Sequence, residues 1–253
     1  MDNDDSPVGY VLTRREALTL MGAGGFALLT GCGRKGLAAS DTAGAQTAAA
    51  TTRSGTCVAR PQQTEGPYFV DERLNRSDIR SDPSTGNVKP GALLALTFNV
   101  STLASNTCAP LPGAVVDVWH CDQLGVYSDV TDPGFDSRGQ RFLRGYQTTD
   151  ANGIAKFVTI YPGWYSGRTV HIHFKIRSAP SSRPGFEFTS QLYFDDALTD
   201  QVHSRPPYSD KGLRDIRNRG DGIFRRGGDQ LTLAVASTPQ GYAGTFNIAL
   251  QAV

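Results

Sequence analysis

The sequence predicts an all-β fold of the sandwich type. Apolar and polar residues alternate over several short stretches, as they do in strands that bury one face only. The chain has 28 glycines and 14 prolines, many of them between these stretches, where they indicate turns. Short strands separated by such turns are typical of two sheets packed face to face.

Seven stretches fit this pattern, and most are rich in β-branched and aromatic residues. Residues 149–153, Thr-Asp-Ala-Asn-Gly, predict a tight turn between two of them. Residues 195–229 are polar and contain Pro and Gly, so we expect mostly loop there, with a short helix around 210–218. The fold therefore has long loops and little helix. The expected strands are 93–100, 114–121, 154–160, 170–176, 187–194, 231–236 and 242–251.

The N-terminal part indicates export. Arg14 and Arg15 form a twin-arginine pattern, and the apolar stretch 18–29 that follows is too short to span a bilayer. It ends in Leu-Thr-Gly before Cys32, which resembles a lipoprotein cleavage box. We therefore expect an export signal over 1–32 and an extracytoplasmic protein tethered through lipidated Cys32. Cleavage further on would instead give a freely secreted protein.

The rest of the chain divides into a linker and one domain. Residues 33–55 consist mainly of Ala, Thr, Ser, Gly and Gln, which predicts a flexible linker. Residues 56–253 are long enough to bury a single sizeable core. A net charge of +1 without any basic block argues against nucleic acid as a partner. The sequence leaves the oligomeric state open.

The cysteines fit an oxidising compartment. We expect a disulfide between Cys57 and Cys108, which would pin the start of the domain to the loop before Leu111. Cys121 lies in an expected strand beside Trp119 and is expected to be a buried free thiol.

Two histidines share one face of an expected strand. Residues 170–176 alternate strictly, so His171 and His173 point to the same side, about 7 Å apart along the strand. Such a pair can bind one metal ion, although histidines are also often partly buried without any ligand role. With Tyr127 and Tyr165, the set would contain two imidazoles and two phenolates. These hard anionic donors suit ferric iron better than zinc or cuprous copper.

Five stretches resemble the intradiol ring-cleavage dioxygenases, the non-haem ferric enzymes of the catechol and protocatechuate dioxygenase type. The most specific is Tyr-Pro-Gly-Trp-Tyr at 161–165, followed by Arg-Thr-Val-His-Ile-His-Phe at 168–174. The others occur in the family's order, at compatible spacings. They are residues 64–69, 111–128, 146–153 and 190–194. The resemblance covers about residues 57–250 and implies an immunoglobulin-like sandwich with the metal among its strands and loops.

The resemblance also implies roles for individual residues. The tyrosine of the Pro-Gly-x-Tyr motif, Tyr165, would bind the metal and also accept a proton from the substrate. Arg168 would stabilise charge that develops on the substrate. Gln191 would lie near the substrate. His120 and Tyr161 are off the ligand pattern, and His203 is expected to be solvated. The implied ligands of a non-haem Fe(III) are Tyr127, Tyr165, His171 and His173.

The implied reaction is the O2-dependent cleavage of a catechol-type ring between its two hydroxylated carbons, giving a cis,cis-muconate-type diacid. A small aromatic diol and O2 would be the substrates. Pro67 and Tyr68 would line the pocket, or would form no more than a packed turn. Only Ser166 and Gly167 separate Tyr165 from the Arg168 motif, whereas the protocatechuate-type enzymes have a longer insertion, so the particular catechol is not implied. A helical dimerisation region like that of the catechol-type enzymes is also not found.

Two other classes of function stay open. The first is a non-catalytic, extracytoplasmic β-sandwich that binds aromatic or carbohydrate ligands. The second is a metalloenzyme of another type, such as a copper oxidase or a zinc hydrolase. The paired tyrosines argue against zinc, which favours His, Cys and carboxylate ligands.

Overall fold

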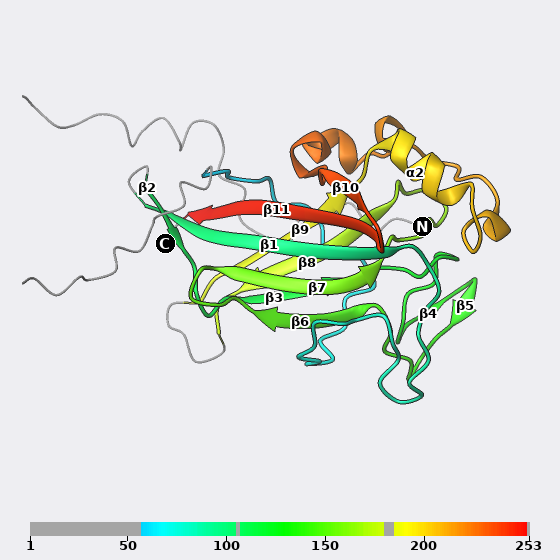
Figure 1. Cartoon of the computed structure of the whole chain (residues 1–253), viewed down its shortest axis with the longest axis horizontal. Helices are drawn as coiled ribbons and strands as arrows, with labels where there is room; N and C mark the ends of the chain where they lie inside the picture. The colour runs from blue at the N-terminus through cyan, green and yellow to red at the C-terminus, as the bar shows by residue number, and fades with distance from the viewer. Residues whose placement is uncertain (1–56, 105–106, 180–184, 252–253) are drawn as a thin grey trace, which may run out of the picture. The chain divides into compact units, whose positions relative to one another are not determined.

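The computed structural model describes residues 57–104, 107–179 and 185–251. The expected export signal and linker lie outside these residues. Most of the described strands belong to two β-sheets (Figure 1), so the all-β prediction is confirmed. None of the described helices is long and apolar enough to span a membrane.

The first sheet is built around one long strand, β1 (Leu93–Ala104). This strand pairs in parallel with β11 along almost its whole length, and its other edge is shared by β7 and β2. Strand β10 continues the sheet on the far side of β11. The partners of β1 in this sheet are β2 (Thr107–Pro110), β7 (Ile154–Ile160), β10 (Val235–Thr238) and β11 (Gly241–Gln251).

The second sheet has four strands in the order β6-β3-β8-β9, all antiparallel. A separate two-stranded hairpin, β4 (Thr131–Asp132) with β5 (Phe135–Asp136), lies in the connection between β3 and β6. The four strands are β3 (Val115–Trp119), β6 (Arg144–Thr148), β8 (His171–Arg177) and β9 (Glu187–Tyr193).

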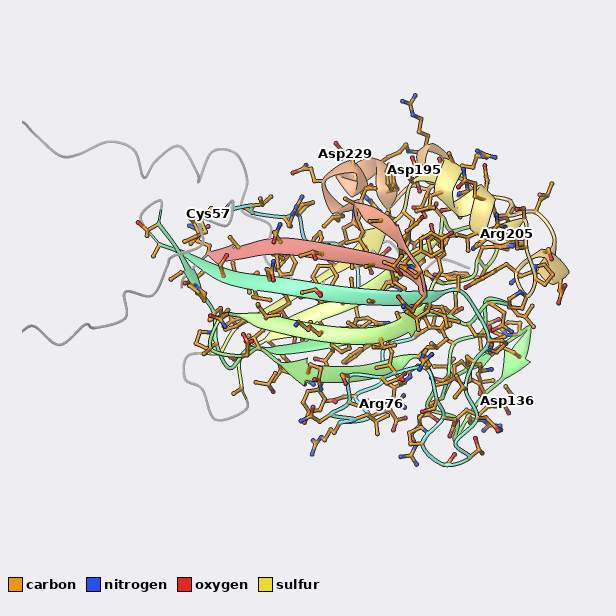
Figure 2. All side chains as sticks on the ribbon, viewed as in Figure 1. Cys57, Arg76, Asp136, Asp195, Arg205 and Asp229 are labelled. Carbon is orange, nitrogen blue, oxygen red and sulfur yellow. A yellow bond between two sulfur atoms is a disulfide. The ribbon has the colours of Figure 1, made fainter. Side chains whose placement is uncertain are left out.

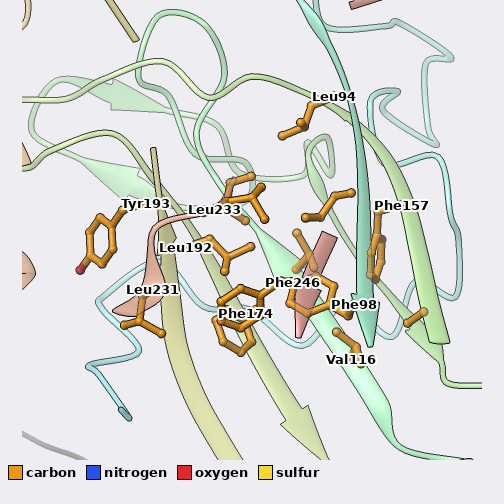
Figure 3. Packing of buried hydrophobic residues seen from close by; sticks show 14 of the residues in the cluster. Leu94, Phe98, Val116, Phe157, Phe174, Leu192, Tyr193, Leu231, Leu233 and Phe246 are labelled. Atoms are coloured by element: carbon orange, nitrogen blue, oxygen red, sulfur yellow. The ribbon is translucent and has the colours of Figure 1, made fainter. Parts of the chain in front are cut away.

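The core lies between the two sheets (Figure 3). Alternate residues of β1 are buried, as the sequence pattern predicts. Phe98 of β1 meets Phe174 of β8 with 5.3 Å between the ring centroids, and Phe174 meets Phe246 of β11 at 5.4 Å. Because successive side chains of a strand point to opposite faces, packing Ile172 and Phe174 inward turns His171 and His173 to the outer face of the second sheet.

That outer face is crossed by the first described residues, 57–75, which we call the strap. The backbone N–H of Gln63 donates to the Thr189 carbonyl of β9 at 3.1 Å. Further along, Glu65 pairs with Lys175 of β8, and Phe69 packs on Trp119 of β3 with 4.7 Å between the centroids. The strap therefore covers the sheet face that carries the two histidines.

The helical content differs from the prediction. The α-helix is α2 (Asp196–His203), whose N-cap carboxylate on Asp195 accepts from the Leu198 backbone N–H at 2.9 Å. The expected helix at 210–218 is wrong, because Gly212 takes a left-handed φ of 84° and ends the turn there.

The expected strand at 231–236 begins only at Val235. Single 3-10 turns make up the remaining helical elements, η1 (Ser209–Lys211), η2 (Asn218–Gly220), η3 (Phe224–Arg226) and η4 (Gly228–Leu231).

A disulfide joins Cys57, the first residue of the strap, to Cys108 of β2, with 5.7 Å between the Cα atoms (Figure 2). The predicted pairing is confirmed, and so is the buried free thiol at Cys121. The bridge closes a loop with a sequence separation of 51 residues, so Cys108→Ser should lower the free energy of unfolding by about 2–4 kcal/mol.

Urea unfolding of the wild type and of Cys108→Ser, each with and without reductant, checks this prediction. Reductant should lower the stability of the wild type to that of the variant and leave the variant unchanged. Equal stability of the two proteins under oxidising conditions would contradict it.

Candidate metal centre

The two histidines are held rigidly on β8. His171 lies opposite Tyr193, and His173 lies opposite Trp119 on one side and Gln191 on the other. The Trp119 ring stacks on the His173 imidazole, with 5.0 Å between centroids and 8° between planes. Both histidines are almost fully buried, at 2 % and 1 % exposed.

Four side chains from three segments converge at this point. The Nε2 atoms of His171 and His173 are 3.0 Å apart. The hydroxyl oxygen of Tyr165 lies 3.3 Å from His171 Nε2, and that of Tyr127 lies 3.5 Å from it. Donor atoms that share one ion through bonds of about 2.0–2.1 Å lie about 3 Å from one another. The spacing of these four donors therefore fits a single metal ion.

The protonation of the histidines also fits a ligand role. His171 Nδ1 is 2.6 Å from the Thr169 carbonyl oxygen, which can only accept, so Nδ1 carries the proton and Nε2 keeps its lone pair. Burial lowers the pKa of both histidines well below their ordinary value, and the Arg168 charge adds to this effect. Both imidazoles are therefore neutral at physiological pH, as metal ligands must be.

The two tyrosines differ in their surroundings. Tyr127 is 1 % exposed, and burial raises the pKa of its phenol well above the ordinary value in the metal-free protein. Tyr165 is only partly buried. Among the residues that the structure describes, no three histidines, cysteines or carboxylates gather into a metal site. A metal at this centre would therefore depend on the two phenols, and this hard donor set fits Fe(III) better than zinc.

Arg168 lies beside the cluster in a fixed network. Its Nη2 donates to Gln191 Oε1 at 2.6 Å, and its Nε donates to Asp221 Oδ2 at 2.8 Å. Gln191 is fully buried, and its Nε2 donates to the Thr64 carbonyl of the strap at 3.0 Å. Burial disfavours the charge on Arg168, but Tyr165 and Asp221 outweigh it and hold its pKa above the ordinary value.

Asp221 is a part of this network that the sequence analysis missed. Besides Arg168, it accepts from the Thr169 backbone N–H at 2.9 Å, and its other oxygen accepts from Ile223 and Phe224 N–H at 2.7 and 3.0 Å. It therefore fixes both Arg168 and the residue whose carbonyl orients His171. A single carboxylate in a polar loop, 53 residues from Arg168, gives no signal in the sequence.

Tyr68 of the strap lies against both phenols. Its ring stacks on Tyr127, with 4.5 Å between centroids, and meets Tyr165 edge-on at 6.0 Å. Its hydroxyl donates to Asp132 Oδ2 of β4 at 2.7 Å. Pro67, the other expected pocket residue, is exposed beside it.

The remaining histidines stand apart from the cluster. His120 is 2.8 Å from the Cys121 carbonyl oxygen and 2.6 Å from Thr159 Oγ1, which is the structural role that its position suggested. The expectation that His203 is solvated is wrong. It is the last residue of α2, only 8 % exposed, and its Nε2 donates to the Pro162 carbonyl at 3.0 Å. Its neighbours in the sequence are polar, so the sequence pattern did not predict that His203 is buried.

Known proteins resemble this chain in sequence and in fold. The family model described as Dioxygenase matches residues 64–204. A chlorocatechol 1,2-dioxygenase of Pseudomonas putida is 29% identical over 150 residues, covering 52% of each chain. Catechol 1,2-dioxygenase 2 of Acinetobacter lwoffii is 31% identical over 157 residues, covering 53% of this chain and 51% of the other. The chain thus spans about half the length of the curated relatives it matches.

Among solved structures, an intradiol ring-cleavage dioxygenase from Tetranychus urticae is 33% identical with a TM-score of 0.66. The match covers 77% of this chain and 95% of that one. Because this match spans nearly a whole solved dioxygenase and the family model spans more than half of the chain, the chain belongs to the intradiol ring-cleavage dioxygenase family.

Proposed function

We propose that the protein uses non-haem Fe(III) and O2 to cleave a catechol-type ring between its two hydroxylated carbons, giving a cis,cis-muconate-type diacid. Tyr127, Tyr165, His171 and His173 would hold the iron. The observation that carries this proposal is the convergence of two phenol oxygens and the His173 Nε2 atom within 3.0–3.5 Å of His171 Nε2. When bound there, ferric iron would supply a Lewis acid that makes the hydroxyls of the diol more acidic.

The two tyrosines would have different roles. Tyr127 is buried and its ring stacks on that of Tyr68, which restricts its movement. Tyr165 belongs to a loop, is partly exposed and is followed by the exposed residues Ser166 and Gly167. Its phenolate oxygen is therefore the better base for a proton of the incoming diol, and its ring is the one with space to move aside.

Arg168 would stabilise negative charge that develops on the ring during cleavage. Its guanidinium is held in place by Gln191 on one side and Asp221 on the other, so little reorganisation is needed during the reaction. Gln191 would act as a positioning residue here, since it ties Arg168 to the strap through Thr64. Tyr68, with Pro67, would form a wall of the substrate pocket.

Asp221→Asn should slow turnover about 10–100-fold, the usual cost of losing a group that orients a metal ligand or its partner. It should also lower the free energy of unfolding by about 3–5 kcal/mol, because Arg168 would keep its buried charge without a counter-ion. Steady-state kinetics and urea unfolding measure the two effects. Asp229→Asn, at an exposed position of the η4 turn, is the control and should change neither. Wild-type turnover in Asp221→Asn would remove Asp221 from this role.

The place of action is also a proposal. The twin-arginine pattern and the Cys32 context support export and a membrane tether through a lipid, or secretion if cleavage occurs further on. The Cys57–Cys108 disulfide favours an oxidising compartment.

Oxygen labelling tests the proposed reaction directly. Iron-loaded protein is mixed with catechol under 18O2, and the product is identified by mass spectrometry. We expect cis,cis-muconate carrying two labelled oxygen atoms. A yellow semialdehyde product would indicate cleavage of a ring bond beside the two hydroxylated carbons instead of the bond between them. Absence of O2 uptake with catechol, chlorocatechols and hydroxyquinol would refute the proposal.

A further inference from the structure

The two tyrosines of the metal centre stand on irregular backbone. Tyr127 lies in the irregular stretch between β3 and β4, of which we call residues 120–127 the first tyrosine loop, and Tyr165 lies in the second tyrosine loop, residues 161–170. Within the described chain neither loop takes part in strand pairing, in contrast to the histidines on β8. Side-chain and turn contacts must therefore set the separation of the two phenol oxygens.

The two loops touch through their backbones. The N–H of Gly163 donates to the Asp122 carbonyl at 3.2 Å. A Cβ atom at Gly163 would overlap the Asp122 carbonyl oxygen, and one at Gly125 would overlap that of Trp164. Glycine at both positions is therefore required for the approach. Besides the backbone hydrogen bond, the Cys121 thiol of the first loop donates to the Gly163 carbonyl at 3.5 Å, and both are modest neutral contacts.

Lys211 joins the two loops from a third segment. Its Nζ donates to the Leu124 carbonyl at 2.5 Å and to the Trp164 carbonyl at 2.7 Å. Leu124 comes three residues before Tyr127, and Trp164 comes directly before Tyr165. The ammonium group also lies 4.6 Å from the centroid of the Trp164 ring. One charged group therefore binds the backbone of both tyrosine loops, and charge-assisted hydrogen bonds are the stronger kind.

The segment that carries Lys211 is itself anchored. The buried Tyr208 hydroxyl donates to the Tyr161 carbonyl at 2.7 Å and accepts from the Ala92 backbone N–H at 3.0 Å. On the other side of Lys211, the Asp215 carboxylate accepts from Ser166 Oγ at 2.5 Å and from the Gly167 N–H at 3.2 Å. Because Tyr161, Ser166 and Gly167 belong to the second tyrosine loop, these contacts bind the Lys211 segment to that loop, and Arg214 also ties the segment to Asp196 and Asp200 of α2. Lys211 then joins the first tyrosine loop to this base through the Leu124 carbonyl.

We infer that Lys211 is a positioning residue for the metal centre. It holds the two tyrosine loops together, and so holds the phenol oxygens of Tyr127 and Tyr165 at the separation that one ion needs. The inference rests on the proposed function, because it assigns the purpose of the contact to iron binding. The contact itself can be tested without any metal.

The test compares the full-length wild type with three variants. Lys211→Met keeps an unbranched side chain and removes the charge and the donors, and Lys211→Arg keeps both. Lys156→Met is the matched control, since Lys156 is exposed on β7. Hydrogen exchange is measured on the metal-free proteins, and Fe(III) affinity is measured by competition with a chelator, together with the visible tyrosinate-to-iron band.

In Lys211→Met, both tyrosine loops should exchange at least about 10-fold faster while β8 is unchanged, since only the local contact is lost. The Fe(III) affinity should fall about 10–100-fold, and the tyrosinate band should shift. Lys211→Arg should recover most of the affinity, and Lys156→Met should match the wild type. A Lys211→Gln variant serves the same comparison if the Met variant folds poorly.

Wild-type exchange in both loops of Lys211→Met would overturn the inference, and so would faster exchange confined to one loop. Unchanged iron affinity and band despite looser loops would overturn the positioning role. A wild-type protein that binds no Fe(III) would instead refute the proposed function, while the exchange data would still decide whether Lys211 joins the loops.

Discussion

Tyr165→Phe should reduce the rate of ring cleavage by about 10²–10⁴-fold, the range for losing a general base in the site. It removes the phenol oxygen that lies 3.3 Å from His171 Nε2. It should also remove one of the two tyrosinate-to-iron transitions from the visible spectrum, while Tyr127 and both histidines still hold iron with lower affinity. Stopped-flow turnover and the absorption spectrum measure the two effects on one sample.

Tyr161→Phe is the matched control. Tyr161 lies four residues earlier, is fully buried, and contacts Thr199 Oγ1 at 2.8 Å instead of the metal centre. Its loss should cost some stability and leave the visible spectrum and the rate nearly unchanged. If Tyr165→Phe retained the full spectrum and rate, Tyr165 would be neither ligand nor base.

Arg168→Ala should slow turnover by about 10²-fold or more, the cost of removing one preorganised donor to a developing negative charge. Iron content and the colour of the resting protein should persist, because Arg168 is bonded to Gln191 and Asp221 and is not one of the four converging donors. The effect should fall on kcat more than on KM, since the charge develops only during the reaction. Metal analysis and steady-state kinetics separate these outcomes.

Arg214→Ala controls for the loss of a buried ion pair. The Arg214 side chain is 5 % exposed and pairs with Asp196 and Asp200 of α2 at 2.6 and 2.9 Å. This variant should lose stability as Arg168→Ala does, yet keep its kcat. A similar fall in kcat in both variants would mean that Arg168 acts through folding, and a wild-type kcat in Arg168→Ala would remove it from the reaction.

The strands could be predicted because their burial follows a period of two. The expected strand at 154–160 coincides with β7, and 170–176 differs from β8 by one residue at each end. β6 was missed because its partly buried, polar residues give no apolar alternation. The short α2 was missed because its helix signal is an N-cap, Asp195, within a polar stretch that otherwise favours loop.

The residues of the candidate site also fall into two groups, those that the strand pattern predicts and those that it does not. The alternation around His171 and His173 placed both imidazoles on one sheet face from the residues alone. Tyr127 and Tyr165 stand on loops, where no period applies, and only the resemblance to the family selected them. The contacts of Asp221 and Lys211 depend on how the 208–221 segment folds back on the tyrosine loops, which is tertiary information that a single sequence does not contain.

An aerobic visible absorption spectrum of the purified protein, with metal analysis of the same sample, tests the central claim most directly. Two phenolates on Fe(III) should give a wine-red protein that contains about one iron per chain, with a broad band that shifts when catechol is added. A protein that stays colourless after iron loading would contradict the ferric bis-tyrosinate centre.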